Sequence, residues 1–233
     1  VHISPSHHYP TGLVMPIARR QELLRWAQEV PARVILEDDY DSEFRFVGRP
    51  IPTLFSIDGG EQVVYLNTFS KTIAPSIRIS FMVLPRRLLA DFRQKLGFYA
   101  CTVSAFEQYT LAQFLAGGWY EKHLSRMRKH YRQKRDAVIA AVYKSPLAPY
   151  AAITEEDAGL HFLLRLAGAP SDETLRREAE QRGIRLAMLS DYYQCPQDAP
   201  QHVLVVNYTG IDLDRLPAAL ERLAALWKEN DHV

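Results

Sequence analysis

Lys71 stands out as a residue that could do chemistry, because it follows a run of apolar and β-branched residues at 63–67 (VVYLN). Two small hydroxyl side chains precede it, Thr68 and Ser70, and a guanidinium comes seven residues later, at Arg78. An unprotonated lysine amine attacks carbonyl carbons, and hydroxyls together with a planar guanidinium bind phosphate. The stretch is compatible with a site for a phosphorylated aldehyde, although a lysine that follows a strand is by itself more typical of an ordinary surface residue.

A second group of reactive side chains ends another short apolar run, RVILEDDY at 33–40. Asp38 and Tyr40 are two positions apart, a spacing that directs both side chains to the same side of an extended chain. A carboxylate keeps the ring nitrogen of pyridoxal phosphate protonated, and a phenol can hydrogen-bond the ring oxygen. With Lys71 as the amine that forms an imine with the aldehyde, these residue types fit that cofactor. Asp39 is a competing acid.

Alternating helical and strand patterns predict an α/β fold that would position these groups. An amphipathic helix is predicted over 16–30, with a proline suited to its first turn. Short strands are predicted at 33–40, 63–67 and 78–85, and the alternation of strands with helices favours a mainly parallel sheet. Ligands of such sheets bind at the carboxyl ends of the strands, where Lys71 and the acids of the EDDY run both lie.

The rest of the chain predicts further helices and a second domain. Helical patterns cover 86–96 and 104–144, the latter broken near the two glycines at 117–118. Two prolines in SPLAPY (145–150) indicate a linker, so we predict a first domain over residues 1–145 and a second over residues 146–233. The second domain is predicted to contain a strand at 159–166, a helix at 171–182, strands near 184–189 and 202–208, and a closing helix at 212–228.

Four segments together resemble the aminotransferase-type domain of MocR/GabR-type transcriptional regulators of the GntR family, which are fold-type-I pyridoxal phosphate proteins. These segments are SHHYPTG (6–12), EDDYDSEFRF (37–46), FSKTIAPSIRIS (69–80) and YEKHLSRMRKHYRQKRD (120–136). The resemblance covers essentially the whole chain in order. It implies the fold-type-I aminotransferase fold, with a partial large domain truncated at its N-terminus, a small α+β C-terminal domain and a homodimer.

The resemblance also implies roles for individual residues. Lys71 would form the internal aldimine, and Asp38, rather than Asp39, would pair with the pyridinium nitrogen. Tyr40 would hydrogen-bond the ring hydroxyl. The other implied cofactor-binding residues are Thr68, Ser70 and Arg78, which would hold the phosphate, and Tyr9, which stands where many aminotransferases have an asparagine.

Two departures separate this chain from an ordinary aminotransferase. The arginine that binds a substrate carboxylate in the family is expected near MLSDYYQ (188–194), where Asp191 would repel a carboxylate instead. Arg165 or Arg185 could substitute from elsewhere. In addition, the family's winged helix-turn-helix and its phosphate loop belong to a part that would precede Val1, so we expect them to be absent from this chain.

These features predict a pyridoxal phosphate-binding effector domain that senses the cofactor or an amino compound through Lys71. DNA would be bound only through the absent winged helix-turn-helix. The alternative is a free-standing aminotransferase of the 2-aminoadipate or kynurenine type, and a third interpretation is a silent domain kept for dimerisation. Enzymatic activity is left open between these alternatives.

Composition excludes other classes of function. The net charge is +1, with 28 basic and 27 acidic side chains, so no strong field directs the chain to nucleic acid or to a membrane surface. The basic cluster at 126–135 interleaves with apolar positions and favours a solvated helix face. No apolar run is long enough to span a bilayer, and no signal pattern opens the chain. We therefore expect a cytoplasmic protein.

No metal site is predicted. The acids at 38, 39 and 41 lack the pattern of a regular oxygen-ligand loop. His7 and His8 are followed by no zinc-type partner spacing, which favours structural or exposed histidines. Cys101 and Cys195 have neither metal-type nor redox-type spacing and are interpreted as reduced thiols.

Overall fold

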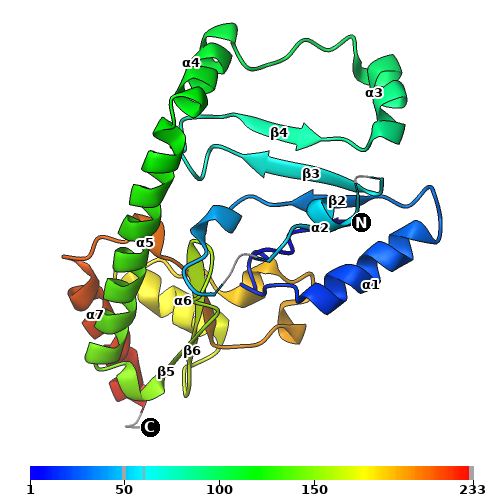
Figure 1. Ribbon diagram of the computed structural model, residues 1–233. Helices are drawn as coiled ribbons and strands as arrows, with labels where there is room; N and C mark the ends of the chain where they lie inside the picture. Colours follow the sequence, from blue (N-terminus) through cyan, green and yellow to red (C-terminus); the bar gives the residue numbers. More distant parts are fainter. Residues whose placement is uncertain (49–50, 60, 231–233) are drawn as a thin grey trace. The chain divides into compact units, whose positions relative to one another are not determined.

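The computed structural model describes residues 1–48, 51–59 and 61–230, which form two compact units (Figure 1). Unit 1 contains Val1–His8 and Leu13–Lys129, and unit 2 contains Tyr9–Gly12 and the chain from His130 onward. The chain thus enters unit 2 briefly near its start and again inside the long helix α5 (Trp119–Lys144). The predicted domain boundary after residue 145 follows the end of this helix and stays a prediction.

A four-stranded sheet forms the centre of unit 1, in the order β1 (His2–Ile3), β2 (Ile35–Asp38), β3 (Val63–Thr68) and β4 (Ser80–Val83). The first three strands are parallel, and β4 is antiparallel to β3. The prediction of a mainly parallel sheet is therefore correct. β4 differs because residues 69–79, which join it to β3, contain no helix, and a parallel connection needs a longer crossover.

Two helices of unit 1 pack their apolar positions against this sheet. Helix α1 (Ile17–Gln28) begins after Pro16, and its Leu24 and Ala27 are buried on one stripe. These two side chains form a core with Ile35 of β2, Val63 of β3 and Leu54 of the short helix α2 (Leu54–Ile57). The resulting layer of helix on sheet holds β2 and β3 in place.

The helical region after β4 also follows the prediction. A 3₁₀ turn at Arg86–Leu88 leads into α3 (Leu89–Leu96), and α4 (Ala105–Ala116) is followed by α5. Gly118, with φ of +68°, adopts the left-handed conformation that ends α4, which an L side chain rarely adopts. Ser104 and Glu107 form a reciprocal capping box at the start of α4.

Unit 2 is built on an antiparallel sheet of three strands, β5 (Ala151–Thr154), β6 (His161–Leu166) and β7 (Val203–Asn207), in that order. Two helices accompany it, α6 (Asp172–Gln181) and α7 (Leu216–Asn230). Period-two alternation decides the faces of β6, since Leu164 and Leu166 are buried while Arg165 between them is exposed.

One predicted strand is wrong. Residues 184–187 form no strand, and Met188 makes only an isolated bridge to Leu204 before a 3₁₀ turn at Leu189–Tyr192. The carboxylate of Asp191 accepts the backbone N–H of Met188 at 3.0 Å, and this contact folds the chain into a turn where a strand would have to continue. Conversely, β1 and β5 were not predicted, because each is short and exists through pairing with a neighbour.

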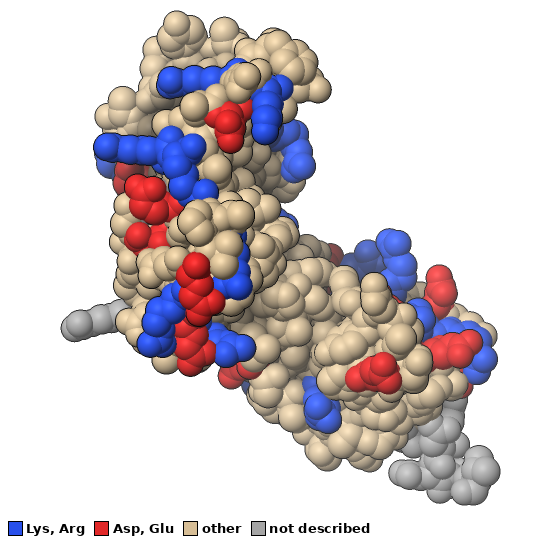
Figure 2. Space-filling view, turned by 90° about the vertical axis from the view of Figure 1, so that its right-hand side faces the viewer, with Lys and Arg blue, Asp and Glu red and all other residues tan. Residues whose placement is uncertain are grey.

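Charges of both signs are mixed on the surface. On the face shown in Figure 2, lysine and arginine side chains are interspersed with aspartate and glutamate, and no single basic patch dominates. Two members of the basic cluster of α5 are also bonded within their own unit: Arg128 to the carbonyl of Glu43, and Lys134 to the carbonyl of Thr209. In the part of the chain that is described, none of the helices is both long and apolar enough to cross a membrane.

Candidate functional site

The carboxyl ends of β2 and β3 meet at one edge of the unit 1 sheet. The two strands are parallel, and Asp38, the last residue of β2, lies beside Leu66 of β3. Thr68 ends β3, and Lys71 follows in the turn beyond it. The parallel register therefore brings the acids of β2 and the lysine turn of β3 to the same edge, which is where open α/β sheets bind ligands.

The three predicted phosphate ligands lie together in the connection between β3 and β4. The Arg78 guanidinium donates to Ser70 Oγ at 3.3 Å, and the Ser70 backbone N–H donates to Thr68 Oγ1 at 3.2 Å. The hydroxyls of Ser70 and Thr68 donate to the carbonyls of Ile77 and Ile79, at 2.6 and 3.2 Å. These bonds fold residues 69–79 back on themselves, and they leave the exposed guanidinium as the main source of further donors.

Asp38 and Tyr40 occupy different environments. The Asp38 side chain is 35% exposed, and its Oδ2 lies 3.5 Å from Nε2 of His2. Because β2 ends at Asp38, the extended geometry that would place Tyr40 on the same side does not continue. The Tyr40 hydroxyl instead donates to the backbone carbonyl of His7 at 3.0 Å.

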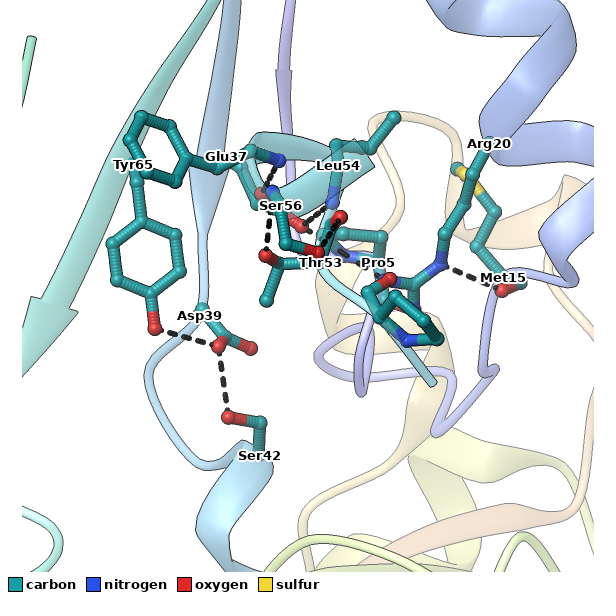
Figure 3. A network of polar contacts seen from close by, with 12 residues as sticks. Pro5, Met15, Arg20, Glu37, Asp39, Ser42, Thr53, Leu54, Ser56 and Tyr65 are labelled. Carbon is teal, nitrogen blue, oxygen red and sulfur yellow. Dashed lines mark hydrogen bonds and ion pairs between the residues drawn. The ribbon is translucent and has the colours of Figure 1, made fainter. Parts of the chain in front are cut away.

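Asp39 is turned inward, unlike Asp38. It is buried, and its Oδ2 accepts hydrogen bonds from the hydroxyls of Ser42 and Tyr65, both at 2.8 Å (Figure 3). The Tyr65 hydroxyl in turn accepts from Nδ2 of Asn67 at 2.8 Å. Of the two competing acids, Asp38 is therefore the one whose carboxylate is accessible to a ligand.

A buried ion pair between Arg20 of α1 and Glu37 of β2 was not anticipated from the sequence. Arg20 of α1 donates to the carbonyls of Pro5, Met15 and Pro52, at 2.8, 3.1 and 2.9 Å. Glu37 of β2 accepts the backbone N–H groups of Leu54 and Phe55, each at 2.8 Å. Figure 3 shows both side chains in the same polar network. In the sequence, Arg20 looks like any basic residue of an amphipathic helix, so no signal marked it.

His7 and Asp41 form a second buried pair, also missed as a functional feature. Nδ1 of His7 lies 2.9 Å from Oδ2 of Asp41, and the side chains are 1% and 2% exposed. Burial raises the pKa of Asp41; the hydrogen bond and charge of His7 and the positive charge of Lys71 oppose this, while the charge of Asp39 adds to it. Lys71 itself is exposed.

Tyr9 belongs to unit 2, where it contacts Tyr192. The two hydroxyls are 2.6 Å apart and the rings are perpendicular, with centroids 5.2 Å apart. Partial burial, and then the hydrogen bond to Tyr192, raise the pKa of Tyr9 to about 12. The neighbouring Asp191 is paired with Arg176 of α6. Its negative charge, expected to repel a ligand carboxylate, is therefore largely compensated by that arginine.

Nearly the whole chain matches one protein family. Residues 2–227 match the family Aminotransferase class I and II, and the chain belongs to this family. Its relatives include an uncharacterized HTH-type transcriptional regulator, YdeL of Bacillus subtilis, which is 38% identical over 228 residues, covering 98% of this chain and 48% of YdeL. The probable rhizopine catabolism regulatory protein MocR of Rhizobium meliloti is 36% identical, with coverages of 91% and 42%. The chain spans about half the length of the curated relatives it matches.

Solved aminotransferases share its fold. The kynurenine aminotransferase of Pyrococcus horikoshii superposes with a TM-score of 0.83 at 28% identity, covering 99% of this chain and 56% of that one. LysN, an α-aminoadipate aminotransferase from Thermus thermophilus, gives 0.80 at 26% identity, with coverages of 100% and 59%, and was crystallised with N-(5'-phosphopyridoxyl)-L-leucine. The predicted resemblance to MocR-type regulators, the fold-type-I aminotransferase fold and pyridoxal phosphate as the cofactor of this fold are confirmed.

Proposed function

We propose that this chain is the pyridoxal phosphate-binding effector domain of a MocR-type transcriptional regulator, and that it senses the cofactor or an amino compound through Lys71. The similarity to transcriptional regulators over nearly the whole chain supports the regulatory part. The observation that carries the binding part is the cluster of Thr68, Ser70 and Arg78 beside the carboxyl ends of β2 and β3.

The chemistry of the donor set fits this cofactor. The Arg78 guanidinium supplies a permanent positive charge for a phosphate, supported by Ser70 and Thr68. The accessible Asp38 carboxylate can hold a protonated ring nitrogen, and Lys71 can supply the amine for a covalent bond. Bound there, pyridoxal phosphate would supply an aldehyde carbon for amines and an electron-withdrawing ring. Tyr40 would contribute its phenol to the ring oxygen in exchange for its present bond to the carbonyl of His7. The role of Tyr9, which the sequence resemblance implies, stays a prediction.

Absorption and covalent labelling test the proposal directly. The full-length protein is mixed with pyridoxal phosphate, its visible absorption is recorded, and the adduct is then reduced with borohydride and mapped by mass spectrometry. We expect a new band and a pyridoxyl label on Lys71. Lys71→Ala should abolish both, whereas Lys95→Ala, which removes an exposed lysine of α3, should change neither. A band that survives Lys71→Ala unchanged would exclude the proposed site.

The regulatory part of the proposal concerns the complete protein. DNA would be bound by an N-terminal winged helix-turn-helix, in a cytoplasmic homodimer, and occupancy of the Lys71 site would change the affinity for DNA through linkage. Titrating an operator fragment with full-length protein, in the presence and absence of pyridoxal phosphate, measures that coupling. Equal affinities under both conditions would argue against cofactor sensing and would leave an amino compound as the remaining effector.

The aminotransferase alternative has its own support, because solved neighbours above 25% identity include a kynurenine and an α-aminoadipate aminotransferase. In that case Lys71 would act as general base after exchange with an amino acid. Steady turnover of kynurenine or 2-aminoadipate with a 2-oxo acid would favour this function. A single half-reaction without turnover would favour the regulator.

A further inference from the structure

The turn that carries Lys71 is anchored by the residue that follows the lysine. The Ile73 backbone N–H donates to the Phe69 carbonyl at 2.9 Å, so the backbone makes a single hydrogen-bonded turn around Lys71. Within this turn Thr72 is completely buried, whereas Lys71 is exposed. Thr72 thus faces the interior of unit 1 while Lys71 faces outward. The orientation of the lysine therefore depends on what holds Thr72.

Helix α5 supplies a partner for Thr72. Near the start of the helix, Nε2 of His123 lies 3.0 Å from the backbone carbonyl of Thr72. A carbonyl can only accept a hydrogen bond, so Nε2 is the ring nitrogen that carries the proton here. Both residues belong to unit 1, although they are 51 positions apart in the sequence. One hydrogen bond from α5 thus reaches the residue next to Lys71.

Aromatic rings hold both partners of this hydrogen bond. The imidazole of His123 meets the ring of Phe114 in α4, with centroids 6.2 Å apart and planes at 61°. Phe69, where the lysine turn begins, meets Tyr120 of α5 edge to face, with centroids 5.8 Å apart. Tyr120 and His123 are three positions apart, a spacing that places both side chains on one face of the helix. Both belong to the segment 120–136, which the proposed cofactor contacts do not use.

We infer that His123 is a positioning residue for Lys71: its hydrogen bond to the Thr72 carbonyl fixes the turn that presents the lysine amine. Without this bond a buried carbonyl loses its donor, and the turn populates other conformations. The amine is then correctly placed for a ligand aldehyde in a smaller fraction of the molecules. The inference rests on the proposed covalent role of Lys71 and acts on that role through the backbone.

Two ligands separate positioning from binding in the full-length protein. Pyridoxal phosphate can form a covalent bond with Lys71, whereas pyridoxine phosphate has an alcohol in place of the aldehyde and can only bind without that bond. In His123→Leu, the affinity for pyridoxal phosphate should fall about 5- to 10-fold, the effect of one lost hydrogen bond. The affinity for pyridoxine phosphate should stay that of the wild type. Absorption titration measures the first affinity, and isothermal titration calorimetry measures the second.

Two further variants control this comparison. His123→Gln keeps a side-chain N–H that can reach the Thr72 carbonyl, so it should restore most of the affinity for pyridoxal phosphate. His130→Leu removes an exposed histidine about two turns further along α5 and should change neither affinity.

Hydrogen exchange tests the turn itself without any cofactor. The amide of Ile73 is protected by its bond to Phe69, so its exchange rate reports how often the turn opens. In His123→Leu this exchange should be about 5- to 10-fold faster than in the wild type. In His123→Gln it should remain close to the wild-type rate.

The outcomes distinguish this inference from the function on which it rests. Without an absorption band in the wild type, the covalent role of Lys71 fails and the positioning role fails with it. With a band present, unchanged affinity and unchanged Ile73 exchange in His123→Leu would overturn the inference and leave the cofactor site intact. Equal losses for both ligands would overturn it as well, because His123 would then support the whole site.

A variant that does not fold leaves the inference testable. Should His123→Leu fail to fold by circular dichroism, His123→Asn takes its place, because its shorter amide cannot reach Thr72. Equal affinities of His123→Asn and His123→Gln for pyridoxal phosphate would then overturn the positioning role.

Discussion

Arg20 and Glu37 lie completely buried in unit 1, with Nη1 of the guanidinium 3.9 Å from Oε1 of the carboxylate. Burial lowers the pKa of Arg20 and raises that of Glu37, because each charged form loses its hydration. The pair and its backbone partners join α1, β2 and the start of α2. Successive side chains of a strand point to opposite faces of the sheet. Because the Glu37 side chain points inward, that of Asp38, the next residue of β2, lies on the other face.

Removing Arg20 should therefore destabilise unit 1. We expect Arg20→Met to lower the free energy of unfolding by about 3–5 kcal/mol, because it leaves Glu37 as an uncompensated buried charge and three carbonyls without their donor. Arg19→Met is the matched control, since Arg19 is exposed and its pair with Glu22 is worth at most about 1 kcal/mol. Urea denaturation measures the free energy of unfolding of both variants. Equal losses would show that the buried pair stabilises unit 1 no more than the exposed pair does.

The partly buried acid Glu43 should make stability depend on pH in a defined direction. Burial raises the pKa of Glu43 in the folded state, so between its ordinary and its raised pKa the folded protein binds more protons than the unfolded chain. The contribution of Glu43 is then fully present below the ordinary pKa and is lost as the pH rises through the folded-state value. Glu43→Gln, which cannot ionise, should gain stability relative to the wild type as the pH rises.

This effect is measured as the difference in urea midpoint between Glu43→Gln and the wild type, from about pH 5 to about pH 8. Using the difference removes the contributions of all other titrating groups. The control is Glu61→Gln, because Glu61 is exposed. A difference that stays constant across this range would mean that Glu43 is ionised throughout, which contradicts the expected direction.

Arg78 should discriminate phosphorylated from unphosphorylated ligands. Arg78→Ala removes the guanidinium that contacts Ser70. The affinity for pyridoxal phosphate should then fall about 10- to 100-fold, which corresponds to the loss of one charge-assisted hydrogen bond. The affinity for pyridoxal, which has no phosphate, should hardly change. Absorption titrations of both ligands make the comparison within one protein. Arg93→Ala in α3 is a control for the loss of an exposed positive charge.

The hydrogen bond between the hydroxyls of Tyr9 and Tyr192 in unit 2 gives a prediction that can be tested without the cofactor. Because the hydrogen bond to Tyr192 contributes to the raised pKa of Tyr9, about 12, Tyr192→Phe should lower the pKa of Tyr9 toward the ordinary tyrosine value. Nuclear magnetic resonance of ring-labelled tyrosine follows Tyr9 during an alkaline titration. Tyr193→Phe changes the adjacent tyrosine and should have no such effect. A Tyr9 titration that is insensitive to both changes would mean that the pair is open in solution.

Much of the fold could be predicted because local chemistry decides it. The apolar spacing of α1 and the β-branched run of β3 produce their elements with little help from distant residues. The break between α4 and α5 likewise depends on a glycine that can take positive φ. Residues 184–189 were predicted as a strand because their composition suits one, but a contact from Asp191 to the Met188 backbone folds the chain differently, and only an isolated bridge from Met188 to Leu204 remains.

The candidate site, like the fold, could be predicted from the sequence only in part. Residue types alone indicated a lysine, an acid and a phosphate-binding cluster at strand ends, and parallel pairing of β2 with β3 explains why strand ends are the place to look. The hydrogen bond from Arg78 to Ser70 depends on how the connection between β3 and β4 folds, which the sequence pattern did not reveal. The hydrogen bond of Tyr40 to His7 could not be anticipated either, because it joins residues that are distant in the chain.

By itself, the sequence determined the family, the order of the main helices and strands, and the chemical types available near Lys71. Only the tertiary structure decided which neighbouring acid does what: Asp38 is accessible, whereas Asp39 and Asp41 are buried against Tyr65 and His7. The physical reason is that ionisation and hydrogen bonding depend on the surrounding dielectric and on partners brought in from distant segments. Three aspartates in one short stretch are chemically identical until packing gives each a different environment.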